Sequence, residues 1–176
     1  MLTLIYHGDA RNLDLINDES IDLIATHPPY LNIIPYSKTK KIPGDLSQVH
    51  DLDEYLNSIR EIAEESYRVL KPGRYCAILI GDTRKSRHYI PVSYRVMEQF
   101  LDVGFILKES IIKTQWNTKI TDQKWRKFVK STEECWIDRR AKGVDFYLIT
   151  HGHLFIFRKP SENENTRKYK YSMKWW

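Results

Sequence analysis

Apolar runs of strand length alternate with segments of helical periodicity along most of this chain. The run at 75–80 is apolar throughout, which is typical of a central strand buried on both faces of a parallel sheet. Shorter apolar runs occur at 3–6 and 21–25, and two longer segments, 105–113 and 145–158, complete the set. We predict a strand in each of these five segments.

Two segments carry apolar residues at helical spacing. The first covers 52–70, with Asp51 in the N-cap position and Glu54 three residues later, which is the capping-box pattern. The second begins at Pro91, a residue favoured at the first helical position, and ends before Gly104. We therefore predict two amphipathic helices.

Strands that alternate with helices indicate an α/β fold with a mostly parallel sheet. We assign 1–159 to a single domain that contains a basic insertion at 117–143, and 160–176 to a polar tail. Residues 31–50 carry prolines and lysines but little periodicity, so we predict a mobile loop there.

The composition narrows the class of protein. With 176 residues, 41% hydrophobic and 12% aromatic, the chain suits one folded domain. A net charge of +5 favours a polyanionic partner. Cys76 and Cys135 form no C-x-x-C pair, which favours reduced intracellular thiols. No signal peptide precedes the first predicted strand and no apolar run is long enough to span a membrane, so we expect a cytoplasmic protein without a membrane partner.

The tetrapeptide His27-Pro28-Pro29-Tyr30 follows the predicted strand at 21–25. Two prolines fix two φ angles, and Pro28 restricts His27 as well, so the turn is stiff. It lies at the carboxyl end of a strand, where open α/β sheets place their ligands. Such a turn can aim a carbonyl, a polar side chain and a ring at a flat substrate that carries an amino group. A proline turn with a packed tyrosine is the alternative.

The segments around this tetrapeptide resemble the amino-methylating DNA methyltransferases. These enzymes transfer a methyl group from S-adenosylmethionine (SAM) to the exocyclic amine of adenine or cytosine. The resemblance covers about 3–159 and implies a partial Rossmann-like methyltransferase fold, with helices on both faces of the sheet and an antiparallel last strand. The matching segments are LIYHGDAR at 4–11, ESIDLIATHPPY at 19–30, RVLKPGR at 68–74, AILIGDT at 77–83, IIKTQW at 111–116 and HGHLFIFRK at 151–159.

Two departures from the family pattern affect the expected activity. The catalytic motif usually begins with Asp, Asn or Ser, and here it begins with His27. The glycine-rich loop that holds SAM is missing, because no two of the seven glycines lie within three positions of each other. The SAM site is therefore expected to be incomplete in this chain.

The resemblance also implies an open sheet edge. A complete family member has seven strands, and the strand that carries the glycine loop sits beside the catalytic strand. Without it that edge is unpaired, and an unpaired edge invites pairing with another chain. We expect either a partner subunit that supplies the SAM half or a homodimer.

The resemblance assigns roles to the motif residues. The Pro28 carbonyl and the His27 side chain would accept hydrogen bonds from the target amine, and Tyr30 would stack on the extruded base. Asp9 and His27 are the expected contacts to SAM. For each there is an alternative: His27 fills the site of a degenerate enzyme, Tyr30 is a core residue, or Asp9 is a turn residue after Gly8.

Basic residues form two candidate nucleic-acid contacts, each with a merely solvated loop as the alternative. Arg84, Lys85 and Arg87 follow the predicted strand at 75–80. The 117–143 insertion interleaves basic residues with aromatic ones, a combination that suits phosphates and stacked bases. The candidates in this insertion are Lys119, Lys124, Arg126, Lys127 and Lys130.

His151 and His153 alternate on a predicted strand and therefore share a face. Gly152 lies between them, and no cysteine or acidic residue is near, so we predict no metal site.

Two classes of function remain open. One is a SAM-dependent DNA methyltransferase, or the catalytic-motif half of one. The other is a non-catalytic nucleic-acid-binding subunit on the same fold. RNA is an alternative to DNA as substrate, because base extrusion and stacking serve both polymers.

Overall fold

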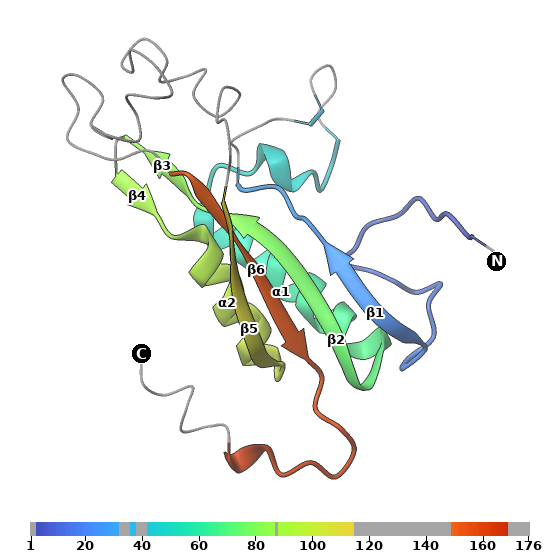
Figure 1. The fold of residues 1–176 in the computed structure, drawn as a ribbon. Helices are drawn as coiled ribbons and strands as arrows, with labels where there is room; N and C mark the ends of the chain where they lie inside the picture. The colour runs from blue at the N-terminus through green and yellow to red at the C-terminus, as the bar shows by residue number, and fades with distance from the viewer. Residues whose placement is uncertain (1–2, 32–35, 38–41, 87, 115–148, 169–176) are drawn as a thin grey trace.

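One four-stranded sheet forms the centre of the molecule (Figure 1). Its strand order is β1-β2-β6-β5, and a small separate hairpin pairs β3 with β4. The strands are β1 (Ile21–Thr26), β2 (Leu70–Gly81), β3 (Thr83–Lys85), β4 (His88–Ile90), β5 (Ile106–Thr114) and β6 (His151–Arg158). The computed structural model describes residues 3–31, 36–37, 42–86, 88–114 and 149–168.

The strand directions agree with the expected sheet. β1 pairs with β2 in parallel, whereas β6 pairs antiparallel with both β2 and β5. Three strands therefore run in one direction and β6 runs in the other, which confirms the antiparallel last strand. The strand predicted over 145–158 is observed as β6 from His151 onward, and its first four residues lie outside the described part.

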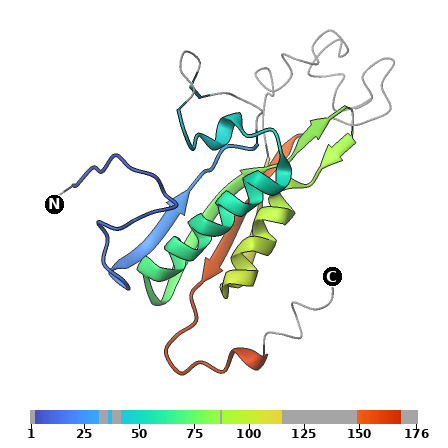
Figure 2. The same cartoon turned by 180° about the vertical axis from the view of Figure 1, so that it is seen from behind.

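Two helices, α1 (Leu52–Val69) and α2 (Val92–Val103), lie side by side on one face of the sheet (Figures 1 and 2). The Asp51 side chain accepts a hydrogen bond from the Glu54 backbone N–H at 2.9 Å, as the capping pattern predicts. At the other end of the helical pair, Gly104 closes α2 with a φ of 118°, a conformation that disfavours residues with a Cβ. Pro91 is the N-cap of α2 and not its first residue.

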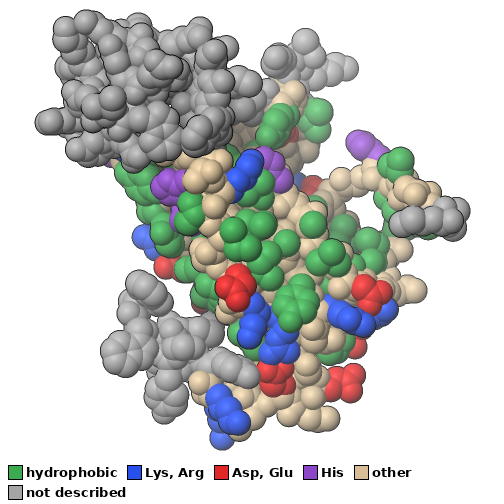
Figure 3. Space-filling view, viewed as in Figure 1, with side chains coloured by type: hydrophobic (Ala, Val, Ile, Leu, Met, Phe, Trp, Pro, Cys, Tyr) green, Lys and Arg blue, Asp and Glu red, His purple; other side chains and the backbone are tan. Residues whose placement is uncertain are grey.

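The expectation of helices on both faces needs correction for the described residues. The connections β1-α1-β2 and β2-α2-β5 cross the sheet in the same direction. Connections of one hand that move in one direction place their helices on the same face. The opposite face shows apolar side chains at its surface in Figure 3, and Tyr75 and Ile111 are exposed there.

The predicted strand at 3–6 is wrong. No strand is assigned there, and Leu4, Ile5 and Tyr6 are 64%, 92% and 61% exposed. The physical reason is that an apolar run becomes a strand only when it has a neighbour with which to pair. Within the described residues β1 is the edge of the sheet, as the missing neighbour strand implied, and Leu23 on β1 is 63% exposed.

The core fills the space between the sheet and its two helices. Alternate residues of β2, among them Cys76, Ile78 and Ile80, point into it and are buried. Aromatic rings provide much of its volume: Phe100 of α2 stacks on Phe157 of β6 with centroids 5.0 Å apart. No helix among the described residues has the length and apolar character needed to cross a membrane.

A buried lysine fastens the end of β6 to the junction of α1 and β2. Lys159 is only 6% exposed, and its ammonium donates to the carbonyl oxygens of Tyr67 and Leu70 at 2.9 and 2.8 Å. It also pairs with Glu19 at 3.0 Å and lies 4.8 Å from the centre of the Tyr67 ring. One cation thus satisfies two carbonyls where the first helix ends.

We predict that Lys159→Met lowers the free energy of unfolding by about 2 kcal/mol or more, because two carbonyl oxygens lose their donor. Urea denaturation followed by circular dichroism measures this change. The control is Lys108→Met at an exposed position of β5, which should change the free energy by less than about 0.5 kcal/mol. Equal effects of the two substitutions would contradict the proposed anchoring role.

Candidate active site

The diproline corner begins where β1 ends. Thr26 pairs with Ile78 of β2 in the last register position of β1, and His27 follows directly. The chain then turns away from the sheet, and the Pro29 carbonyl accepts hydrogen bonds from the Tyr55 hydroxyl at 2.7 Å and from the Leu31 N–H at 3.1 Å. The corner is therefore anchored to α1.

Tyr55 fixes the diproline corner in place, a role that the sequence pattern did not predict. Its side chain is fully buried, and burial raises the pKa of its hydroxyl, so the hydroxyl remains a donor. A buried tyrosine finds a partner for its hydroxyl, and here the partner is the Pro29 carbonyl. Its place on the buried face of α1 follows from the helical period, but its partner does not.

His27 and Tyr30 bond to each other across the corner. The Nε2 atom of His27 lies 2.6 Å from the Tyr30 hydroxyl, and the rings meet edge to face at 5.2 Å. Burial, and secondly the charge of Lys113, lower the pKa of His27, while burial raises the pKa of Tyr30. At neutral pH both side chains are uncharged, and one donates to the other.

The Tyr30 ring occupies a space that glycine leaves open. A Cβ atom added at Gly81 would lie 2.7 Å from Cε2 of Tyr30, closer than atoms can pack. Gly81 pairs with Gly152 of β6, so two glycines meet beneath this region. Tyr30 packs against the core but keeps partial exposure, and is therefore neither a fully buried core residue nor a free surface residue.

A pocket of about 600 Å³ opens beside the corner. His27 and Asp9, the two expected SAM contacts, both line it, which places them in one cavity although they come from different segments. Ile59, Ile78 and Phe100 add apolar surface. A pocket with mostly apolar walls and a few polar groups is typical of a small-molecule site.

Asp9 lies in a turn and also lines the pocket. Its carboxylate accepts from the Arg11 backbone N–H at 3.0 Å and pairs with the Arg11 guanidinium at 2.5 Å. The hydrogen bond from the Arg11 side chain is the main reason that the pKa of Asp9 is lowered. Asp9 is therefore ionised at neutral pH and remains a hydrogen-bond acceptor.

The described basic candidates lie on the hairpin that follows β2. Arg84 and Lys85 are on β3, and the Arg84 guanidinium lies 5.6 Å from the centre of the Tyr89 ring. The end of β2 is also the end at which β1 reaches His27, because the two strands are parallel. Arg87, Lys119, Lys124, Arg126, Lys127 and Lys130 lie outside the described residues, so their contact with nucleic acid stays a prediction.

Asp82 follows the strand at 75–80 and so was expected at this end of the sheet, but the contacts of its side chain were not predicted. Its carboxylate accepts from the Ser93 backbone N–H at 2.8 Å, which caps α2, and from the Tyr89 hydroxyl. It also lies 3.8 Å from Nε2 of His153. The premise that no acidic residue is near the histidine pair is therefore wrong in space, although it holds along the sequence.

Comparison with known proteins identifies the family. The family model for DNA methylases (N6_N4_Mtase) matches residues 21–175. Type II methyltransferase M.MjaVI of Methanocaldococcus jannaschii is 33% identical over 135 residues, with 74% of this chain and 62% of that protein covered. Type II methyltransferase M.BglII of Bacillus subtilis is 34% identical over 113 residues, with 63% of this chain and 29% of that protein covered.

Solved structures share the fold. PvuII DNA methyltransferase, which is cytosine-N4-specific, superposes with a TM-score of 0.56 at 21% identity, with 88% of this chain and 49% of that chain covered. A Thermus thermophilus protein described as a DNA modification methylase, in complex with S-adenosyl-L-methionine, gives a TM-score of 0.58 at 20% identity, with 90% of this chain and 56% of that chain covered.

The chain spans only part of each of these curated relatives, between 29% and 62% of their length. The family match nevertheless extends over most of this chain and includes the diproline corner and the whole described sheet. The chain therefore belongs to the N6/N4 DNA methylase family.

Proposed function

We propose that this chain is the catalytic-motif half of a SAM-dependent DNA methyltransferase that acts on the exocyclic amine of adenine or cytosine. The observation that supports it best is the anchored corner at the end of β1. There a partly exposed Tyr30 lies beside His27, and His27 shares a pocket with Asp9. Type II methyltransferases are among the relatives, and the matching family model is that of DNA methylases, which supports DNA as the substrate.

The chemistry asks for positioning more than for a reactive side chain. An aromatic amine is a poor nucleophile because its lone pair is delocalised into the ring. Hydrogen-bond acceptors that draw the amine towards tetrahedral geometry, in line with the sulfonium, therefore speed methyl transfer. Within the described residues Tyr55 occupies the Pro29 carbonyl, whereas no partner occupies the Pro28 carbonyl, which is the first acceptor in this proposal.

His27 is the second acceptor in this proposal, and its bond to Tyr30 decides which nitrogen serves. A neutral imidazole has one donor and one acceptor nitrogen. If Nε2–H donates to the Tyr30 hydroxyl, Nδ1 keeps a lone pair for the substrate amine. If Nε2 accepts from Tyr30 instead, no acceptor remains, and the alternative function of a non-catalytic nucleic-acid-binding subunit gains support.

In this proposal the SAM half comes from residues outside the 176 of this sequence. β1 is the edge of the described sheet, and Leu23 on this strand is exposed, as are Leu4 and Ile5 in the segment before it. Such an edge favours pairing with another chain. A second copy of this chain would bring the same seven separated glycines, and so could not supply a G-x-G loop.

Base extrusion tests the proposed function directly. We expect a DNA duplex with 2-aminopurine at the target position to gain fluorescence when the chain binds, because the base leaves the stack. Gly81→Ala should displace the Tyr30 ring, because its Cβ would overlap the ring. Both Gly81→Ala and Tyr30→Ala should weaken binding of the extruded base about 5- to 150-fold, because base–aromatic stacking contributes about 1–3 kcal/mol.

Gly8→Ala is the matched control for this experiment. A Cβ there meets no atom within 4 Å, so the fluorescence gain should stay unchanged. Binding without any fluorescence gain in the unmodified chain would refute the proposed handling of the base, and a normal gain in Gly81→Ala would refute the role of the Tyr30 ring.

We predict that the isolated chain binds SAM weakly or not at all, because the pocket beside Asp9 lacks the glycine-rich loop. Isothermal titration calorimetry measures this. The control titration uses S-adenosylhomocysteine, which lacks the transferred methyl group and the sulfonium charge. Saturable one-to-one binding of SAM with high affinity would contradict the requirement for a SAM half outside these residues.

We predict that His27 titrates below the ordinary histidine value of 6.5, because burial and Lys113 disfavour its charged form and so lower its pKa. NMR of the imidazole C–H resonances measures the midpoint. Because the pKa of His27 is lowered, its imidazole is neutral above pH 6.5. As the pH falls through the lowered pKa, the imidazole becomes protonated and can no longer accept a hydrogen bond. The folding stability that depends on the neutral form is lost over the same range. A midpoint above 6.5 would contradict this environment.

A further inference from the structure

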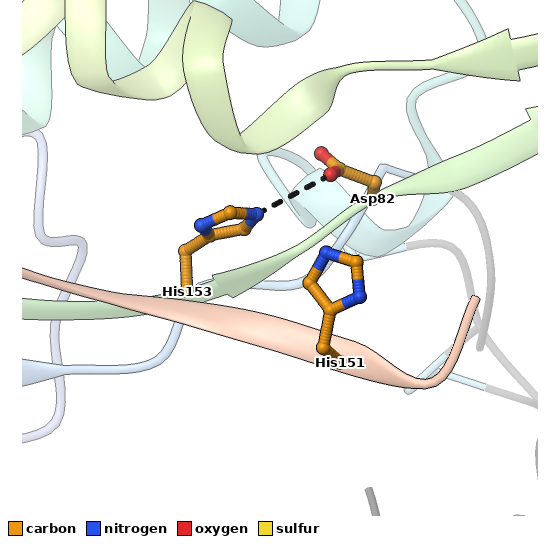
Figure 4. Close-up of side chains that lie close together, drawn as sticks. All are labelled: Asp82, His151 and His153. Carbon is orange, nitrogen blue, oxygen red and sulfur yellow. Dashed lines mark ion pairs between the residues drawn. The ribbon is translucent and has the colours of Figure 1, made fainter. Parts of the chain in front are cut away.

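Three potential metal ligands converge at one end of the sheet, outside the corner of His27 and Tyr30. Asp82 follows β2, while His151 and His153 project from the same face of β6 (Figure 4). One ligand atom from each of the three side chains lies within 4.8 Å of the other two. Nε2 of His153 approaches Oδ2 of Asp82 to 3.8 Å.

His153 has an unexplained environment for a buried polar side chain. It is 3% exposed, and neither of its ring nitrogens has a hydrogen-bond partner among the described residues. Buried polar groups are nearly always satisfied, and an exception calls for an explanation, of which a bound ion is one. Aromatic rings hold the imidazole in place, with Phe155 stacked at 5.4 Å and Tyr94 edge-on at 5.2 Å.

The Asp82 carboxylate is already oriented towards the two imidazoles. The Ser93 N–H bonds to Oδ1, and the Tyr89 hydroxyl bonds to Oδ2, so the carboxylate cannot rotate freely. Outer contacts of this kind are what fix the ligands of metal sites. An oxygen that accepts one hydrogen bond retains a lone pair for a cation.

We propose that Asp82, His151 and His153 bind one divalent transition metal ion, for which zinc is the best fit. Two imidazole nitrogens and one carboxylate oxygen are a ligand set that zinc accepts, at ligand distances of about 2.0–2.2 Å. The ligand atoms lie within 4.8 Å of one another, so metal binding requires the partly exposed His151 side chain to rotate towards the other two. A fourth coordination position stays open on the side of His151, which is partly exposed.

The ion would join two strands that support the candidate active site. Asp82 directly follows Gly81, and Gly152 lies between the two histidines, so the ion fixes both glycines beneath Tyr30. The proposed metal site does not depend on the proposed methyl transfer, because it is inferred from the positions of the three ligands. The competing arrangement is a direct hydrogen bond between His153 and Asp82 without metal.

Metal content tests the proposal. The full chain is stripped with a chelator, dialysed against micromolar zinc chloride, and analysed by mass spectrometry of the metal. We expect one zinc per chain, no retention of magnesium, and with cobalt(II) a visible spectrum of a nitrogen–oxygen site. Less than stoichiometric zinc in the unmodified chain would overturn the proposal, whatever the variants show.

Variants identify the ligands. We expect His151→Ala and Asp82→Asn to lower zinc affinity about 100-fold or more, while Tyr89→Phe, which removes an outer contact, should lower it about 10-fold. The amide of Asp82→Asn keeps an oxygen for the Ser93 N–H, so α2 stays capped. His88→Ala, at an exposed histidine outside the cluster, should bind as the unmodified chain does. Equal zinc affinity in His151→Ala would overturn the assignment and show adventitious binding.

Discussion

The parallel pairing of β1 with β2 is the constraint on which the candidate site depends. The register that joins Thr26 to Ile78 brings the carboxyl ends of the two strands to the same edge of the sheet. As a result, the corner that follows β1 faces the glycine that ends β2, although these two segments are far apart in the sequence. A shift of one residue in this register would turn every side chain of β1 to the opposite face.

Rigidity at the corner comes from several independent contacts and not from the two prolines alone. The prolines restrict the backbone, but the Tyr55 hydroxyl fixes the corner to α1, and the space over Gly81 admits the ring of Tyr30. Each of these contacts joins segments that are distant in sequence. The arrangement is the kind of preorganised support that a positioning site requires.

Local patterns predict the elements of this fold well, because their causes are local. The capped helix α1 follows from Asp51 and its apolar spacing, and Gly104 marks the end of α2. The predictions that failed depend on which segments contact each other in the folded chain. The apolar run at 3–6 resembles a strand, but no neighbour pairs with it in the described sheet. Likewise, Tyr55 and Asp82 act on residues that only the tertiary fold brings near, so no sequence spacing could reveal their roles.

The hydrogen bond between His27 and Tyr30 connects the two requirements of the proposed reaction. Tyr30 must meet the base, and His27 must accept from its amine, but in this chain the two side chains first bond to each other. An aspartate in place of His27 would carry two acceptor oxygens, so a bond to Tyr30 would leave an acceptor in every case. With histidine, the imidazole can accept a hydrogen bond from the substrate amine only while the proton resides on Nε2. The identity of the first residue of the motif therefore makes the proposed catalysis conditional on a tautomer, and the tautomer depends on the surroundings of the imidazole.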